Sequence, residues 1–388
     1  MKKNIIIDLI FLLIFFTSLI LPTTHISQEK VAKNENRFLN TYVPLYDSAQ
    51  KKINFNYGID FENYLKDRFW GRQRLTVSDK KLNYSLAWRY AKFGELVLDK
   101  KKKFMYEHLI ADRTNTDNEK KIINGLKAFN KFCAKNHIKF YPVIMPRKES
   151  VYPPDLVINN KNEEIKESVR YVSNQSGVKI IFTLDEILAQ KAKIPYMLYH
   201  KTDHHATMDG AYIGYKTLMK ELKKDFPQIE IAKPSDFTYF EDKRVCAEQN
   251  RTFSQGYTCK LVSIPKNICR QFLNINYRYF QHIHINNLQK IKTEEDQLLK
   301  YDFYYPNGAD LKVMVFGDSF TANLMEYLPY SFKNTSLIRL NGPRGIKKEN
   351  QYKILKYYEQ EILKFKPDIL ITYTFYSDYA KLRDLASY

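Results

Sequence analysis

The feature that most constrains the fold of this chain is a regular alternation of short apolar runs and amphipathic stretches from residue 116 onward. The apolar runs have the length of buried strands, and the stretches between them carry apolar residues at helical spacing. Strands that alternate with helices favour a parallel sheet with helices on both faces, an α/β fold. The predicted strands are 138–145, 178–182, 311–316, 336–340 and 367–372. The predicted helices are 116–133, 160–173, 184–192, 207–226, 320–328 and 349–366.

The composition divides the chain into three parts. Residues 1–22 are predicted to be a signal anchor or signal peptide, residues 23–110 a polar stalk with a short helical segment, and residues 111–388 the α/β domain. Within that domain, residues 235–305 are polar, aromatic and irregular in pattern. We predict that they form an insertion of loops and short strands.

Three of the four cysteines fall inside this insertion. The C-x-x-C pairs typical of zinc sites are absent from the sequence. In an oxidising compartment, one disulfide within the insertion is the favoured arrangement. The sequence leaves its pairing open among Cys246, Cys259 and Cys269.

The N-terminus has the pattern of an export signal. Lys2 and Lys3 precede an apolar run at 5–21, which approaches the length of a membrane span. No small-x-small peptidase site follows, so we predict an uncleaved anchor at 4–22, with a cleaved signal as the alternative. Because positive charge stays in the cytoplasm, the rest of the chain is expected in the periplasm, attached to the inner membrane.

The charge balance indicates the class of partner. Lys and Arg number 62 against 43 Asp and Glu, a net charge of +19, which favours an anionic partner. Export argues against nucleic acid, so an anionic glycan or a membrane surface is expected instead. The 30 tyrosines have flat apolar faces and polar tips that suit sugar-like surfaces. The alternative is that an AT-rich genome raises the tyrosine content together with Lys, Asn and Ile.

A candidate nucleophile lies where a predicted strand meets a predicted helix, in Phe316-Gly317-Asp318-Ser319-Phe320. In open parallel sheets, ligands bind at this edge. Gly317 permits a tight turn that lifts Ser319, and backbone N–H groups at the start of a helix can stabilise an oxyanion. The alternative is that Ser319 only caps the helix that follows.

A candidate base lies in a histidine-rich segment just before another predicted helix. Asp203 stands two residues before His205, so its carboxylate can hold one ring nitrogen and leave the other as a general base. A serine hydroxyl needs such a base. A metal site is the rival interpretation, although its residues lie before the predicted helix and not on it, as those of a helical zinc site do. A polar surface turn is the third interpretation. The metal site would use His200, Asp203, His204 and His205.

Together, the two motifs resemble the SGNH hydrolase-like domain of the alginate O-acetyltransferase family, whose members are exported enzymes that acetylate polysaccharides. The first family motif, Asp-x-His with Thr-x-x-Gly-Ala, corresponds to residues 203–211, and the second, with its serine before phenylalanine, to residues 317–320. The likeness runs from about 60 to 380. Its further islands are 67–72, 146–153 and 367–371.

The resemblance implies an SGNH hydrolase-like, flavodoxin-like sheet and a polysaccharide O-acetyltransferase with a Ser-His-Asp triad. Ser319 is the implied nucleophile, His205 the general base and acid, and Asp203 the orienting carboxylate. No cofactor is implied, because a multispanning membrane acyltransferase delivers the acetyl group to enzymes of this type, and the acceptor is a cell-envelope polysaccharide. The oxyanion or substrate candidates are Gly317, Asn341 and Tyr376.

The sequence departs from the family pattern at two places. Ala206 follows the histidine where the family usually has tryptophan, and residues 374–378 replace the usual Glu and Arg after the last strand. These changes bear on acceptor recognition and on the oxyanion hole. An acetyl-ester hydrolase with the same triad, and a non-catalytic glycan-binding or assembly protein, are the alternative functions.

Overall fold

A computed structural model gives the structure of the chain for residue 12 and for residues 27–29, 31–32, 37–48, 51–69, 71–93, 96–101, 104–106, 116–155, 161–195, 197–201, 204–241, 270–275, 284–292, 297–340 and 348–375. Apart from Leu12, the predicted anchor at 4–22 lies outside these ranges. Within them, none of the helices combines the length and the apolar character that a bilayer crossing requires. Other predicted residues outside the ranges are Asp203, Asn341, Tyr376, Cys246, Cys259 and Cys269.

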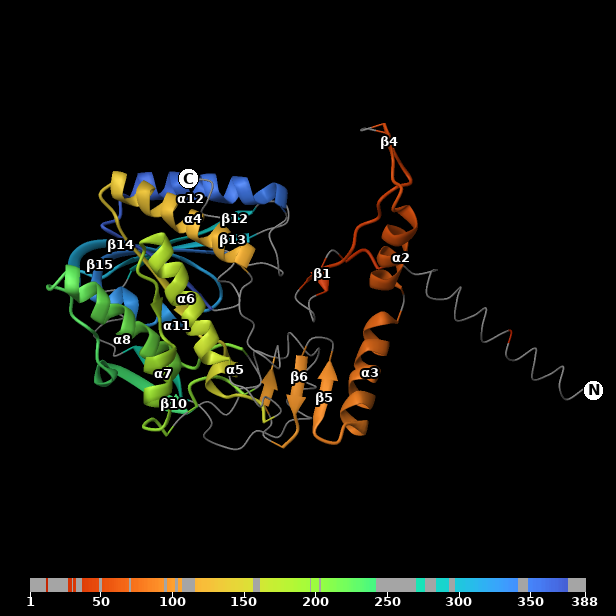
Figure 1. Cartoon of the computed structure of the whole chain (residues 1–388), viewed down its shortest axis with the longest axis horizontal. Helices are drawn as coiled ribbons and strands as arrows, with labels where there is room; N and C mark the ends of the chain where they lie inside the picture. Colours follow the sequence, from red (N-terminus) through yellow and green to blue (C-terminus); the bar gives the residue numbers. More distant parts are fainter. Residues whose placement is uncertain are drawn as a thin grey trace, which may run out of the picture.

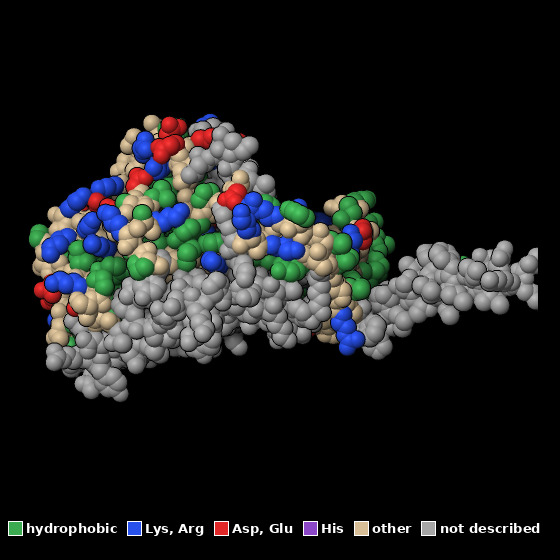
Figure 2. All heavy atoms as spheres, turned by 90° about the horizontal axis from the view of Figure 1, so that it is seen from below, with side chains coloured by type: hydrophobic (Ala, Val, Ile, Leu, Met, Phe, Trp, Pro, Cys, Tyr) green, Lys and Arg blue, Asp and Glu red, His purple; other side chains and the backbone are tan. Residues whose placement is uncertain are grey.

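The N-terminal part lies beside the larger α/β body (Figure 1). Two helices follow one another and lead into a three-stranded antiparallel sheet. From below, hydrophobic side chains gather at the right-hand end of the described residues (Figure 2). The elements are β1 (Val31–Ala32), β2 (Arg37–Phe38), β3 (Tyr46–Asp47), β4 (Lys52–Ile53), α2 (Tyr57–Arg68), α3 (Arg72–Leu86), β5 (Tyr90–Phe93), β6 (Leu96–Asp99) and β7 (Phe104–Tyr106).

The α/β body is built on one seven-stranded sheet with the order β12-β13-β15-β14-β16-β8-β9. The strands from β15 to β9 run parallel, as the sequence predicts, whereas β12 and β13 are antiparallel. The strands are β8 (Lys139–Met145), β9 (Ile181–Phe182), β12 (His284–Lys292), β13 (Gln297–Tyr304), β14 (Ala309–Gly317), β15 (Phe332–Leu340) and β16 (Ile369–Phe375). A separate hairpin consists of β10 (Phe237–Glu241) and β11 (Arg270–Ile275).

Helices cover both faces of this sheet, as predicted. In β14, Val313 and Val315 point into one core cluster, and Met314 and Phe316 point into the other. Each face is buried because successive side chains of a strand point to opposite sides. Figure 1 shows α4 and α12 on the same side of the sheet. The helices are α4 (Thr116–Lys135), α5 (Lys148–Val151), α6 (Asn162–Ser176), α7 (Leu184–Lys191), α8 (Met208–Asp225), α11 (Thr321–Leu324) and α12 (Lys348–Phe365).

The predicted irregular insertion at 235–305 requires a correction at its C-terminal end. There, β12 and β13 are long strands that extend the main sheet. The apolar pattern is weak because one face of β13 carries a buried cation, Lys300, whose Nζ donates to Glu361 of α12 at 2.6 Å. The other face carries Tyr301 and Phe303, which pack against the core.

Two shorter elements differ from their predicted lengths. The strand predicted at 178–182 is reduced to β9, because only two of its residues pair with β8. The helix predicted at 320–328 is limited to the four residues of α11. Pro329 lies in η3 (Leu328–Ser331), a 3-10 turn that leads into β15. Because α11 has only four residues, its helix dipole contributes little to the binding of an anion at its N-terminus.

Candidate active site

The turn that carries Ser319 follows directly after β14. The Asp318 carboxylate accepts a hydrogen bond from the Phe320 N–H at 2.8 Å, and the Asp318 carbonyl accepts one from the Thr321 hydroxyl at 2.6 Å. These bonds fix the turn and leave Ser319 exposed to solvent. The Asp318 side chain therefore has a structural task that the sequence analysis did not assign to it.

Gly317 is required at this turn for space. Its backbone does not have the positive φ of a left-handed turn. A Cβ at this position would lie 2.3 Å from the Thr321 side chain and 2.3 Å from the Tyr373 carbonyl oxygen of β16. Glycine thus lets the end of β14 and its turn pack directly on the neighbouring strand, which differs from the conformational role predicted for it.

The segment around His205 is a closed loop held by its own backbone. The His200 N–H donates to the His205 carbonyl at 3.1 Å, and the Thr207 N–H donates to the Leu198 carbonyl at 3.0 Å. Thr207 then caps α8, because its hydroxyl accepts from the Gly210 N–H at 3.3 Å. These bonds set the direction in which the loop presents His205.

The two loops meet, and the imidazole of His205 contacts the hydroxyl of Ser319. The distance from His205 Nε2 to Ser319 Oγ is 2.7 Å, although 114 positions separate the residues in sequence. The Phe320 ring lies 5.0 Å from the His205 ring, centroid to centroid. His204 packs on His205 with 4.1 Å between ring centroids. The contact of His205 with the Ser319 hydroxyl is the one on which the assignment of the base rests.

Asn323 ties the two loops together, a contact that the sequence analysis missed. Its side-chain amide donates to the Ala206 carbonyl at 2.7 Å. Asn323 lies in α11, four residues after Ser319, so the turn that follows the serine carries it. A polar residue at that spacing from the serine is the signal that could have identified it.

Lys148 supports the His205 loop from beneath. Its side chain is only 2% exposed, and its Nζ lies 3.2 Å from the His200 carbonyl and 3.1 Å from the Lys201 carbonyl. Nearby, the Met105 N–H of β7 donates to the same Lys201 carbonyl at 2.7 Å. Lys148 belongs to the island of family resemblance at 146–153, and this segment thus holds the backbone of the His205 loop.

The other predicted site residues fall outside this arrangement. Asp203, Asn341 and Tyr376 lie in stretches that the structure does not describe. Within the described ranges, no three His, Cys, Asp or Glu side chains form a cluster that could hold a metal ion. The described core of the site is therefore the pair of Ser319 and His205.

The sequence matches the protein family described as SGNH hydrolase-like domain, acetyltransferase AlgX, over residues 104–335. The chain belongs to this family. Membership confirms the resemblance that the two motifs indicate, and the matched range includes both His205 and Ser319. As a member of the AlgX family, the chain is an acetyltransferase with an SGNH hydrolase-like fold. No protein with a curated function matches the sequence.

Solved structures that resemble this AlgX-family chain share little sequence with it. A DHHW family protein from Eubacterium siraeum is 11% identical with a TM-score of 0.50, and the match covers 77% of this chain and 97% of that one. Bacillus cereus PatB1 with a sulfonyl adduct is 15% identical with a TM-score of 0.49, over 73% of this chain and 94% of that one. The O-acetyltransferase domain of Pseudomonas putida AlgJ is 12% identical with a TM-score of 0.42, and the match covers 75% of this chain and 90% of that one.

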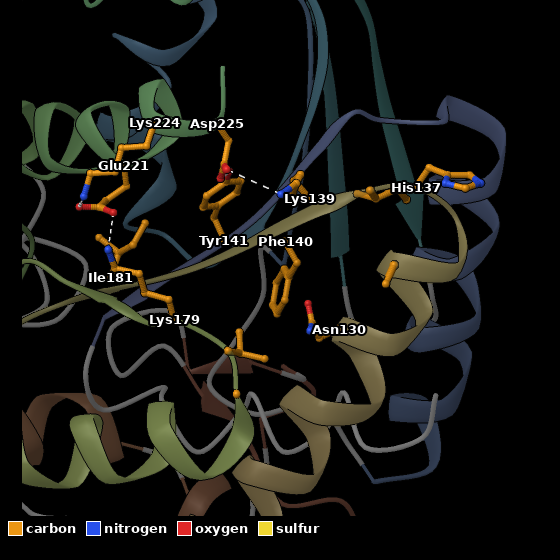
Figure 3. Close-up of a pocket in the computed structure, with 14 residues that line it drawn as sticks. Asn130, His137, Lys139, Phe140, Tyr141, Lys179, Ile181, Glu221, Lys224 and Asp225 are labelled. Carbon is orange, nitrogen blue, oxygen red and sulfur yellow. Dashed lines mark hydrogen bonds and ion pairs between the residues drawn. The ribbon is translucent and has the colours of Figure 1, made fainter. Parts of the chain in front are cut away.

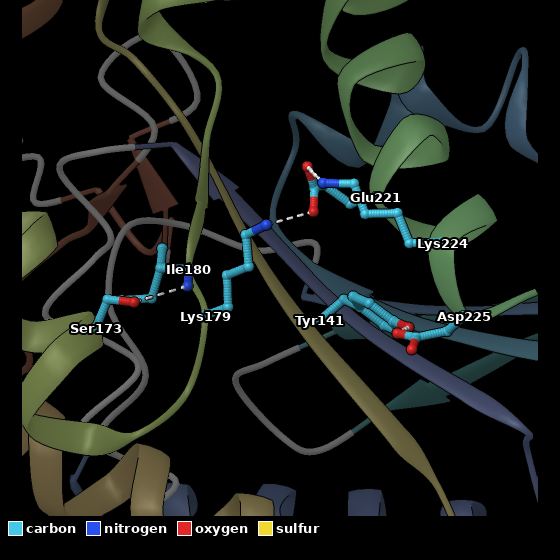
Figure 4. Close-up of polar contacts among 7 residues, drawn as sticks. All are labelled: Tyr141, Ser173, Lys179, Ile180, Glu221, Lys224 and Asp225. Carbon is cyan, nitrogen blue, oxygen red and sulfur yellow. Dashed lines mark hydrogen bonds and ion pairs between the residues drawn. The ribbon is translucent and has the colours of Figure 1, made fainter.

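A pocket of about 710 Å³ lies at the opposite edge of the sheet of this AlgX-family member, at the start of β8 (Figure 3). Lys179 and Lys224 both contact the Glu221 carboxylate there, with Lys224 Nζ at 2.7 Å (Figure 4). Burial opposes the ionisation of Glu221, but the two ammonium groups outweigh it and lower the pKa of this carboxyl. These cations of the pocket are thus already paired with a carboxylate.

The same pocket holds a second polar group. The Tyr141 hydroxyl donates to the Asp225 carboxylate, and Lys139 Nζ lies 3.7 Å from the same side chain (Figure 3). Because β8 runs parallel to β14 through β16, the start of β8 and the end of β14 lie at opposite edges of the sheet. The pocket is therefore separate from the contact between Ser319 and His205.

Proposed function

We propose that this chain transfers an acetyl group to a hydroxyl of a cell-envelope polysaccharide through an acetyl ester on Ser319. In this proposal Ser319 is the nucleophile, His205 the general base and acid, and Asp203 the carboxylate that orients His205. The 2.7 Å contact between His205 Nε2 and Ser319 Oγ carries the proposal, since it is the contact that activates a serine. Membership of the AlgX acetyltransferase family supports polysaccharide O-acetyl transfer as the reaction.

The first step forms the acetyl-serine. The Ser319 Oγ attacks the acetyl carbonyl carbon of the donor, while its proton moves to His205 Nε2. The tetrahedral intermediate then collapses, the bond from the acetyl carbon to the donor breaks, and the leaving group takes the proton from His205. The Ser319 N–H is our candidate for stabilising the oxyanion, and the short α11 means that this donor acts without a long helix behind it.

The second step passes the acetyl group to the acceptor. His205 takes the proton of a sugar hydroxyl, and the sugar oxygen attacks the acetyl carbon of the acetyl-serine. When the second tetrahedral intermediate collapses, Ser319 Oγ leaves and recovers its proton from His205. The open position of Ser319 supports this step, because a bulky acceptor needs access from solvent. Water in place of the sugar would make the chain an acetyl-ester hydrolase.

We further propose where the reaction takes place and what supplies it. Residues 4–22 would hold the chain at the inner membrane, with the domain in the periplasm. A multispanning membrane acyltransferase would supply the acetyl group from the cytoplasm, so the chain itself would need no cofactor. The apolar run at 5–21 and the two lysines before it support this arrangement.

The test uses the purified full chain with a chromogenic acetyl ester as donor. Ser319→Ala and His205→Ala should each reduce donor turnover by about 10³-fold or more, because they remove the nucleophile and the base. Asp203→Asn should also reduce donor turnover, because His205 would lose the carboxylate that orients its ring. Thermal unfolding of each variant shows whether the fold is intact. Full turnover by a folded Ser319→Ala variant would contradict the proposal.

His204→Ala is the matched control, because His204 neighbours His205 in sequence and in space. The His204→Ala variant should retain most of the donor turnover. If His204→Ala were inactive and His205→Ala active, His204 and not His205 would be the general base. Adding an oligosaccharide acceptor separates the two reactions. A transferase yields acetylated oligosaccharide at the expense of acetate, whereas a hydrolase releases the same acetate with or without acceptor.

A further inference from the structure

The N-terminal part of the chain exposes a group of large apolar side chains, which we call the apolar tip. It consists of the β3–β4 hairpin, the residues beside it and the first turn of α2, at the upper right of Figure 1. Phe55 is 94% exposed and Ile59 62%. The remaining members are Tyr42, Leu45, Tyr46 and Ile53, each more than half exposed. Surfaces of soluble proteins seldom leave such a group open unless something covers it.

The pairing of the hairpin places part of the apolar tip on one face. Tyr46 of β3 and Ile53 of β4 are direct cross-strand partners, so their side chains lie on the same face of the hairpin. The Asn54 N–H donates to the Leu45 carbonyl at 2.8 Å, which places Phe55 just beyond that pair. Tyr42 reaches the same region from before the hairpin and packs on α2, where its ring lies 6.4 Å from the ring of Phe61.

Two lysines flank these apolar side chains. Lys51 and Lys52 lie at the turn of the hairpin and are exposed. No ion pair of Lys51 or Lys52 is seen within the described ranges, and the one acidic residue of the hairpin, Asp47, is the cross-strand partner of Lys52. Aromatic and aliphatic side chains next to free cations are typical of segments that enter the headgroup region of an anionic bilayer. Tyrosine fits the same environment, because its ring is apolar and its hydroxyl is polar.

The position of the apolar tip along the chain indicates which surface covers it. The apolar run of residues 5–21 ends 21 residues before Tyr42. A fully extended chain of that length spans about 70 Å at most, so the tip cannot move far from whatever holds the run. An apolar surface with free cations that is tied to an apolar run fits a bilayer better than it fits a soluble protein.

We propose that the apolar tip inserts into the headgroup region of an anionic phospholipid bilayer, with Phe55 and Ile53 below the headgroups and Lys51 and Lys52 on the lipid phosphates. This second contact orients the α/β body relative to the membrane. The inference goes beyond the proposed acetyl transfer and does not depend on it, since no residue of the tip belongs to the site of Ser319 and His205.

The experiment uses the full chain reconstituted in vesicles of phosphatidylcholine and phosphatidylglycerol. A bimane fluorophore is attached at Phe55→Cys and, as the matched control, at Leu363→Cys, an exposed apolar position on α12 that is 46% exposed. Lipids with a nitroxide just below the headgroup quench only fluorophores at that depth. The wild-type chain, labelled in the same way, gives the background of the native cysteines.

We expect the Phe55 label to be quenched several-fold more than the Leu363 label. Adding Lys51→Glu and Lys52→Glu should reduce the quenching in these vesicles but change it little in phosphatidylcholine alone. Equal quenching at the two positions would overturn the proposal. A Phe55 label whose emission shifts to the blue without nitroxide quenching would also overturn it, because protein and not lipid would then cover the tip. Donor turnover by the Phe55→Cys variant, measured in detergent, reports on the catalytic proposal separately.

Discussion

Lys148 is a buried cation that holds the backbone of the loop carrying His205. Replacing it with methionine keeps the length of the side chain but removes its hydrogen bonds to the His200 and Lys201 carbonyls. The Lys201 carbonyl keeps the Met105 N–H as a donor, so the cost comes mainly from the buried His200 carbonyl. A buried carbonyl that loses a donor costs about 1–3 kcal/mol, and we expect the free energy of unfolding to fall by about that amount. Because the loop would lose its support, kcat for the acetyl donor should fall about tenfold while KM changes less.

The control for Lys148→Met is Lys139→Met, at the first residue of β8. Lys139 is exposed and pairs loosely with Asp225 at 3.7 Å, so its loss should change the free energy of unfolding by less than about 1 kcal/mol. Chemical denaturation and steady-state kinetics on both variants test the comparison. If Lys148→Met matched Lys139→Met in stability and in kcat, the loop would not depend on this cation.

Gly317 and Gly58 differ in the space around them, and this difference predicts opposite effects of alanine. At Gly317 a Cβ would collide with the Tyr373 carbonyl at 2.3 Å, so Gly317→Ala must shift the turn of Ser319 and should destabilise the chain by about 1–3 kcal/mol. Gly58 lies in α2 with nothing within 4 Å, so Gly58→Ala should stabilise it by about 0.5–1 kcal/mol. Thermal unfolding measures both, and a stable, active Gly317→Ala would contradict the crowding argument.

At the residue scale, the sequence predicts the two reacting residues, Ser319 and His205, better than it predicts the residues that hold their loops in place. Ser319 and His205 can be predicted because each lies in a short motif at the start of a helix. Lys148 cannot be given its role in this way, because it binds backbone carbonyls, and a carbonyl has no side-chain signature in the sequence. Asn323 also binds a carbonyl, and its spacing from Ser319 is the one signal in the sequence that points to it. Gly317 was predicted to matter, but its partner is a strand 56 positions later that only the folded sheet brings close.

Glu326, in the turn between α11 and η3, makes this element sensitive to pH. Burial raises the pKa of its carboxyl above the ordinary value of 4.5. The folded chain therefore holds this proton more tightly than the unfolded chain does. The stability that the protonated carboxyl contributes is fully present below about pH 4.5 and is lost as the pH rises through the folded pKa.

Glu326→Gln removes this titration and keeps the shape of the side chain. The wild-type free energy of unfolding should decline relative to that of the variant as the pH rises from about 4 to about 8. Glu359→Gln, on α12, is a control carboxyl outside this turn. Denaturant unfolding at several pH values gives both curves. A constant difference between wild type and Glu326→Gln over this range would show that the carboxyl does not titrate as we expect.

At the element scale, the quality of the sequence prediction follows the strength of the apolar pattern. The helix predicted at 207–226 and the one at 349–366 agree with α8 and α12 to within a residue or two, because one face of each is buried on the sheet. The strand β13 was missed, since Lys300 replaces an apolar residue on its inner face. The buried ion pair of Lys300 and Glu361 gives β13 the polar sequence pattern of a surface strand, although this face of the strand is buried.

At the scale of the whole molecule, the sheet combines a parallel part that holds both loops of the site with an antiparallel edge. β13 is the strand that joins the edge to the parallel part, since it pairs with β15 along its whole length. The contact of Lys300 with Glu361 also joins β13 to α12, which packs on one face of the sheet. The edge should therefore unfold together with the parallel part as one unit.

The ion pair of Lys300 and Glu361 tests this coupling. Lys300→Met leaves the Glu361 carboxylate buried without its partner, which should cost about 3–5 kcal/mol of unfolding free energy. The double variant Lys300→Met with Glu361→Leu removes both charges and should recover most of that loss. Lys333→Met is the matched control, because Lys333 pairs with the exposed Asp310 at 3.1 Å and its loss should cost less than about 1 kcal/mol. If denaturant unfolding gave equal losses for the two single variants, the pair would not connect the edge strand to the body, and the antiparallel edge would be free to unfold alone.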